Sequence, residues 1–109
     1  IGIFPLNSYS PKLNFRSLRD QMKQIVIVKP TKGYAHWKNA IEGETHIKAR
    51  AESGIHFLGY GFQEDTERIY IVEELESSDA AEKLFAKFEN YPEEMGVDLS
   101  SVQIIPLED

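Results

Sequence analysis

Two apolar runs joined by a short polar segment, between Ile55 and Leu75, constrain the fold of this chain most. The runs IHFLGYGF and IYIV are rich in β-branched and aromatic residues, and the polar segment QEDTE lies between them. This pattern predicts a β-hairpin. Neither run alternates between apolar and polar residues, so we expect both faces of these strands to be covered.

Composition narrows the class of protein. A chain of 109 residues has the length of one domain, and 41% hydrophobic residues are typical of a folded protein. The net charge of −6 repels phosphate backbones, so we expect no nucleic-acid partner. The absence of cysteine excludes disulfides and thiolate chemistry and is compatible with the cytoplasmic location that we expect. No apolar run approaches the roughly 20 residues of a membrane span.

The domain is predicted to start at Met22, because Met22 and Lys23 directly precede a strongly apolar segment. Residues 1–21 contain two prolines and several Asn and Ser residues, which disfavour a regular strand. We expect residues 1–21 to be an N-terminal extension that packs on the body, residues 22–109, through Ile3, Phe4, Leu6 and Phe15. The alternative is that residues 1–21 are not part of the native protein.

The remaining elements follow from hydrophobic spacing and from breaker residues. A strand is predicted over 24–29, and a helix over 31–53 because no proline interrupts its 3.6-residue period. A second helix is predicted to be capped by the segment SSD, residues 77–79, to be closed or kinked at Pro92 and to end at Gly96. A last strand is predicted over 101–107, and the proline near its end indicates an edge or a terminus.

The order strand, helix, strand, strand, helix, strand predicts an α+β, ferredoxin-like split βαβ fold. In this fold two helices cover one face of a four-stranded antiparallel sheet. The strands are apolar on both faces, however, so the second face also needs a cover. A second copy of the same sheet, related by two-fold symmetry, provides one, and we therefore expect a homodimer.

The chain resembles the dimeric α/β-barrel superfamily, which includes the antibiotic-biosynthesis monooxygenase-like proteins. The resemblance covers residues 23–107 and rests on the element order, on the segment GYAHW at the start of the first helix, residues 33–37, and on Gly54-Ile55 at its end. The chain is also similar to a small uncharacterised branch found in marine microbes. The resemblance implies a barrel formed by two sheets. It does not select an activity, because the superfamily spans oxygenases, isomerases, decarboxylases, haem-degrading enzymes and binding proteins.

A ligand pocket is predicted between the sheet and the helices. If residue 60 pairs with residue 70, Gly59 and Gly61 face the helices and leave space beneath Trp37. The alternative is a β-bulge without a cavity. The expected ligand-binding residues are mostly apolar or aromatic: Tyr34, Trp37, Ile41, Glu44, Lys48, Phe57, Gly59, Ile71 and Phe85.

Glu44 and Lys48 have the i, i+4 spacing of a helical ion pair. They are predicted either to be a solvated pair or to form the polar roof of the pocket, where Lys48 receives a ligand carboxylate. On a continuous helix, His46 points away from Trp37, and His36 and His46 diverge, so we expect no metal site.

The predicted lining suits an elongated acyl-chain-like or aromatic guest, such as a fatty acid. The expected function is therefore that of a small-molecule-binding homodimer without a cofactor. One alternative is a cofactor-independent monooxygenase or isomerase, because Tyr34, Trp37 and Tyr60 match the composition of such sites in the superfamily. The other is a purely structural or partner-binding dimer with a filled core.

Overall fold

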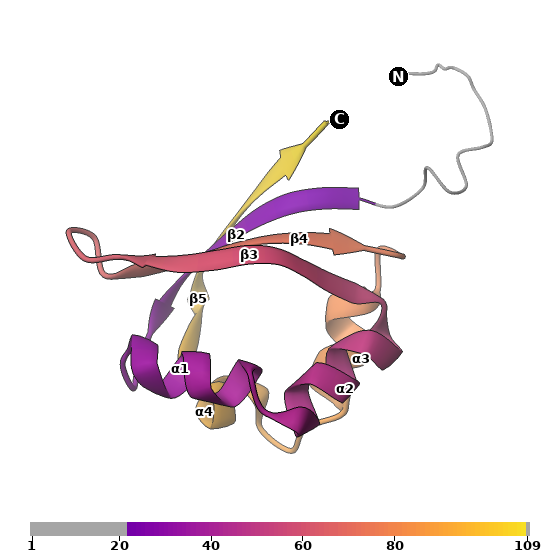
Figure 1. Ribbon diagram of the computed structural model, residues 1–109, viewed down its shortest axis with the longest axis horizontal. Coiled ribbons are helices and arrows are strands. Elements are labelled where there is room, and N and C mark those ends of the chain that lie inside the picture. The colour runs from indigo at the N-terminus through magenta and orange to yellow at the C-terminus, as the bar shows by residue number, and fades with distance from the viewer. Residues whose placement is uncertain (1–21, 109) are drawn as a thin grey trace.

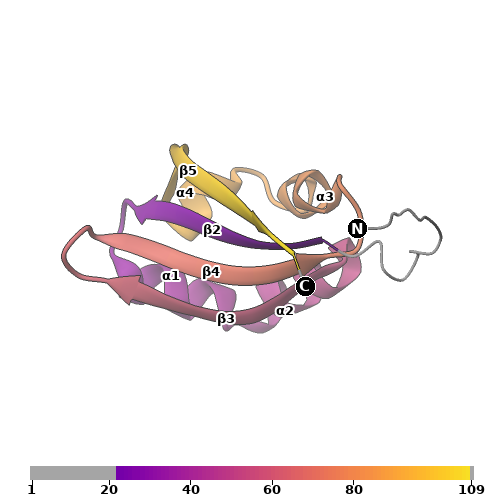
Figure 2. The same cartoon turned by 90° about the horizontal axis from the view of Figure 1, so that it is seen from above.

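The computed structural model describes residues 22–108, so the predicted N-terminal extension, residues 1–21, lies outside the described residues. Four strands form one antiparallel sheet in the order β3-β4-β2-β5. Figure 2 shows this order across the sheet. The strands are β2 (Met22–Pro30), β3 (Ile55–Gln63), β4 (Arg68–Leu75) and β5 (Val97–Leu107).

Within residues 22–108, all four helices lie on one side of this sheet, and the other side carries none of them (Figure 1). This arrangement confirms the α+β class and the antiparallel hairpin, and it is compatible with a ferredoxin-like fold. No helix within residues 22–108 has both the length and the apolar character needed to cross a membrane. The helices are α1 (Tyr34–Ile41), α2 (Glu44–Ser53), α3 (Ala80–Ala86) and α4 (Tyr91–Met95).

The predicted single helix over 31–53 is wrong, because the chain breaks at Gly43 into α1 and α2. Gly43 has extended backbone angles (φ −78°, ψ 156°), which interrupt the helical hydrogen bonding. The break resets the direction of every later side chain. Trp37 and Ile41 of α1 are buried, and so is His46 of α2, which a continuous helix would have turned away from them.

The second predicted helix is likewise divided, into α3 and α4. Pro92 lies in the first turn of α4, where its missing N–H leaves no hydrogen bond unmade, so it helps to begin a helix and does not end one. Gly96 ends α4 in the left-handed conformation, as expected. The predicted cap at Asp79 is not made by its side chain, which instead accepts a hydrogen bond of 2.5 Å from the Ser77 hydroxyl.

A β-bulge in β3 decides which residues face the helices. Phe57 pairs with Glu73, but Gly59 already pairs with Val72, so Leu58 is the extra residue. After the bulge Tyr60 pairs with Ile71. The predicted pairing of residue 60 with residue 70 is therefore wrong. Tyr60 and Phe62 therefore face the helices. Gly59 and Gly61 lie on the helix-free face, where a Cβ atom at either position would have no neighbour within 4 Å.

The interior consists of two apolar clusters between the sheet and the helices. The first lies beneath α1 and α4 and the second beneath α2 and α3. Phe57, Phe88 and Tyr91 pack against both clusters and so mark their junction. The first cluster contains Val28, Trp37, Ile41, Ile69, Ile71, Met95 and Val97, and the second contains Ala49, Ile55, Leu75, Ala80 and Leu84.

Candidate functional site

Aromatic side chains pack together beneath Trp37, where the pocket was predicted. Tyr34 stacks on Phe62, with ring centroids 5.2 Å apart, and Trp37 meets the edge of Tyr60 at 5.5 Å. The predicted site residues Trp37, Ile41 and Ile71 are buried in the first cluster. The bulge explains the difference, because it brings two aromatic residues to the helix side in place of two glycines. The β-bulge is thus present, and Gly59 does not lie on the helix side.

The predicted polar roof also differs from the structure. Glu44 and Lys48 are both exposed, and no ion pair joins these two described residues. Their positions follow from the break at Gly43, which turns this face of α2 toward solvent. Phe85 is partly exposed, and its ring packs on Tyr91 at 4.6 Å. A hollow of about 460 Å³ lies at the α4–β5 end, and none of the predicted site residues lines it.

The side chain of Arg50, on α2, is turned inward. Its guanidinium lies 4.2 Å from the centroid of the Phe57 ring. Nη1 donates to the Ile41 carbonyl oxygen at 2.8 Å and to His46 Nδ1 at 2.7 Å. Within residues 22–108, Arg50 forms no ion pair and makes no hydrogen bond through Nε or Nη2. Burial lowers the pKa of Arg50 from its usual value.

His46 fixes the position of the Arg50 guanidinium through the hydrogen bond at Nδ1. Because a guanidinium only donates, Nδ1 must accept, and the ring proton therefore resides on Nε2. Nε2–H then donates to the Tyr91 hydroxyl at 2.9 Å. Burial, reinforced by the Arg50 charge, lowers the pKa of His46 to about 4. His46 is thus a neutral bridge between Arg50 and Tyr91.

Two further ionisable side chains, Glu73 and Tyr91, lie on the helix side of the sheet, as do His46 and Arg50. Glu73 of β4 is 8% exposed and accepts a hydrogen bond of 2.8 Å from Gln24 Nε2. Burial raises the pKa of Glu73, and the bond from Gln24 partly opposes this. Burial also raises the pKa of Tyr91, so its phenol stays protonated at neutral pH.

No protein-family model, curated protein or solved structure matches this chain. The side chains of the chain itself include a row of polar groups that lies beside the aromatic residues of β3. None of these polar groups was among the predicted site residues. The row consists of Arg50, His46, Tyr91, Glu73 and Gln24.

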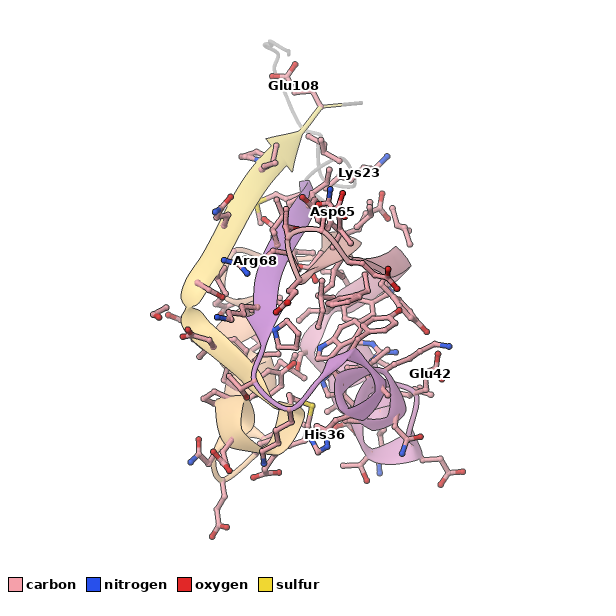
Figure 3. The ribbon with its side chains drawn as sticks, turned by 90° about the vertical axis from the view of Figure 1, so that its left-hand side faces the viewer. Lys23, His36, Glu42, Asp65, Arg68 and Glu108 are labelled. Carbon is pink, nitrogen blue, oxygen red and sulfur yellow. The ribbon has the colours of Figure 1, made fainter. Side chains whose placement is uncertain are left out.

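Tyr60 and Glu42 lie at the outer side of this row. The Tyr60 hydroxyl donates to Glu42 Oε2 at 2.5 Å, and this bond is the main reason that the pKa of Tyr60 is raised. Glu42 lies at the flank of the molecule beside α1, while His36 lies between α1 and α4 (Figure 3). His36 contacts the Glu94 carbonyl oxygen at 3.1 Å. Within residues 22–108, no three ligand side chains converge in a way that could hold a metal ion.

A sequence signal for the missed residues exists. His46, Ala49, Arg50 and Ser53 follow the spacing of one inward helix face, provided that the count starts after Gly43. Chemically, the row offers a guanidinium edge, a neutral histidine bridge, a phenol and a carboxylate. These groups suit the recognition of a small polar ligand with an aromatic or apolar body.

Proposed function

We propose that this protein is a homodimer that binds a small organic acid with an aromatic or apolar body, and that Arg50 receives the carboxylate of the ligand. The observation that carries the binding role is the Nε–Nη2 edge of Arg50, which makes no hydrogen bond to residues 22–108. This edge pairs with a carboxylate through two parallel hydrogen bonds. Phe57 stacks on the face of the guanidinium and so leaves the edge available.

The surroundings of Arg50 favour an aromatic body for the ligand. The rings of Phe57 and Tyr60 lie 6.1 Å apart, and both keep part of their surface exposed. Arg50 is also half-buried, so a ligand from solvent can reach all three side chains. Tyr60 and Phe62 fill the layer beneath α1, and a compact aromatic acid therefore suits the site better than a long acyl chain.

The helix-free face of the sheet supports the homodimer. Ile25, Val72 and Ile105 occupy paired positions on β2, β4 and β5 and face away from the helices. A monomer rarely exposes an apolar patch larger than about 300–600 Å² unless the patch is functional. A second copy of the same sheet is the partner that matches this face, and the pair would form a dimeric α/β barrel.

Calorimetric titration of phenylacetate against three forms of the full chain tests the binding role. Arg50→Gln removes the proposed anchor, and we expect the affinity to fall at least about tenfold, as for the loss of hydrogen bonds to a charged group. Lys48→Gln removes an exposed cation two residues away on the same helix and should change the affinity less than about twofold. Circular dichroism controls for folding.

Phenylacetamide provides the control on the ligand side, because it keeps the shape of phenylacetate and lacks the charge. It should bind the wild type at least about tenfold more weakly than phenylacetate. Equal losses in the Arg50 and Lys48 variants, or equal affinities for the acid and the amide, would contradict the proposal.

A further inference from the structure

Glu73 is a buried carboxylate with few hydrogen-bond donors. Within residues 22–108, its only hydrogen bond comes from Gln24 Nε2. An ionised carboxylate has about four acceptor sites, and buried polar groups normally find partners. Glu73 therefore has acceptor capacity that the described part of the protein does not use.

Tyr91 lacks a hydrogen-bond acceptor within residues 22–108, whereas Glu73 lacks further donors. Its oxygen accepts a hydrogen bond from His46 Nε2, so its own O–H remains to be donated. Within the described range 22–108, no acceptor takes that proton. Tyr91 thus offers one donor, and Glu73 offers a free acceptor in the same layer.

Glu73 and Arg50 are arranged around the same aromatic ring. Phe57 carries the guanidinium over its ring, and in the sheet Phe57 is the cross-strand partner of Glu73. Tyr91 is electrostatically close to both groups: after burial, the charge of Glu73 raises the pKa of Tyr91, and the charge of Arg50 opposes this. Glu73 therefore lies beside Phe57 on the same side of the sheet as Arg50.

We infer that the ligand also carries a hydroxyl group opposite its carboxylate, and that this hydroxyl donates to Glu73 and accepts from Tyr91. A hydroxyl is the group that matches both deficits, because it donates and accepts at once. An ammonium group would satisfy Glu73 and leave the Tyr91 proton without an acceptor. The ligand class is thus a hydroxylated aromatic acid, and this inference rests on the proposed role of Arg50.

Two acids that differ by one hydroxyl group test this inference. Titration of the wild type should show 4-hydroxyphenylacetate binding about tenfold or more tightly than phenylacetate, as for a hydrogen bond to a charged group. In Glu73→Gln, a nearly isosteric variant, we expect this preference to fall below about threefold. Glu74→Gln, which changes the next residue on the opposite face of β4, should keep the full preference.

The outcomes separate this inference from the proposed function. Equal affinities of the two acids for the wild type, or a full preference in Glu73→Gln, would overturn the inference and leave the role of Arg50 standing. If neither acid binds the wild type, both fall. Should Glu73→Gln fail to fold, Tyr91→Phe provides the second variant, and it too must reduce the preference.

Discussion

At the scale of single residues, the buried neutral ring of His46 makes the fold sensitive to pH. His46 is 1% exposed, and its pKa is lowered to about 4, against about 6.5 in an unfolded chain. Between these two values the unfolded chain binds more protons than the folded one, so stability falls as the pH drops from about 6.5 to about 4. The shift corresponds to about 3 kcal/mol.

Urea unfolding of the wild type and His46→Gln at pH 7 and pH 4 measures this effect. Glu73 acts in the opposite direction, because its raised pKa favours the folded state at low pH, so only the difference between the two proteins isolates His46. The stability advantage of the wild type over His46→Gln should shrink by about 2–3 kcal/mol at pH 4. An advantage that does not change with pH would show that His46 is not held neutral.

The cation of the site shows what residue-level reasoning on the sequence could and could not find. The sequence predicted that Lys48, on the second half of the long helix, would either form a solvated pair with Glu44 or face the ligand. The structure places Lys48 in solvent and turns Arg50 inward. Helical spacing gives relative directions correctly, but a single break shifts all of them, and nothing about Gly43 alone distinguishes a break from a tolerated glycine.

At the scale of elements, the order of the strands along the chain and the hairpin were predictable because long apolar runs and their turn signals are local features. The positions of the helix breaks and of the bulge were not, because tertiary packing sets them. At the bulge, Leu58 is displaced from the ladder so that Phe57 and Tyr60 both face the helices. The glycines that suggested a cavity instead lie on the helix-free face.

The break between α1 and α2 should not depend on the glycine itself. Gly43 has backbone angles that alanine also adopts, and an added Cβ would make an ordinary contact of 3.5 Å with the Ala40 carbonyl oxygen. We expect Gly43→Ala to leave stability unchanged or to raise it by up to about 1 kcal/mol. Gly54→Ala is the matched control, because Gly54 has φ 82° and meets the Glu76 side chain, and it should cost at least about 1 kcal/mol.

Urea unfolding measures both changes, and phenylacetate titration reports on the direction of Arg50. If the packing of Trp37 and His46 sets the break, Gly43→Ala keeps its affinity for the ligand. A rise in helical circular dichroism together with a loss of binding would mean that alanine fuses the two helices, and that the glycine alone had kept them apart.

At the scale of the whole molecule, the proposed function assigns different roles to the two faces of the sheet. One face packs against the helices and carries the polar row, while the other is the proposed contact with a second copy. The proposed ligand recognition and self-association should therefore be separable, because their residues alternate along the same strands. A substitution can address one role and leave the other intact, provided that it is placed by the observed register.

Ile104 and Ile105 of β5 offer the sharpest test of the homodimer. They are adjacent and similarly exposed, at 54% and 46%, but Ile104 pairs with Val26 on the helix side and Ile105 pairs with Ile25 on the helix-free side. Light scattering at micromolar concentration should give the wild type twice the chain mass of 12.5 kDa. Ile105→Glu places a charge in the proposed interface and should give the single-chain mass, whereas Ile104→Glu should remain dimeric. A wild type that is monomeric, or two variants that behave alike, would refute a dimer built on this face.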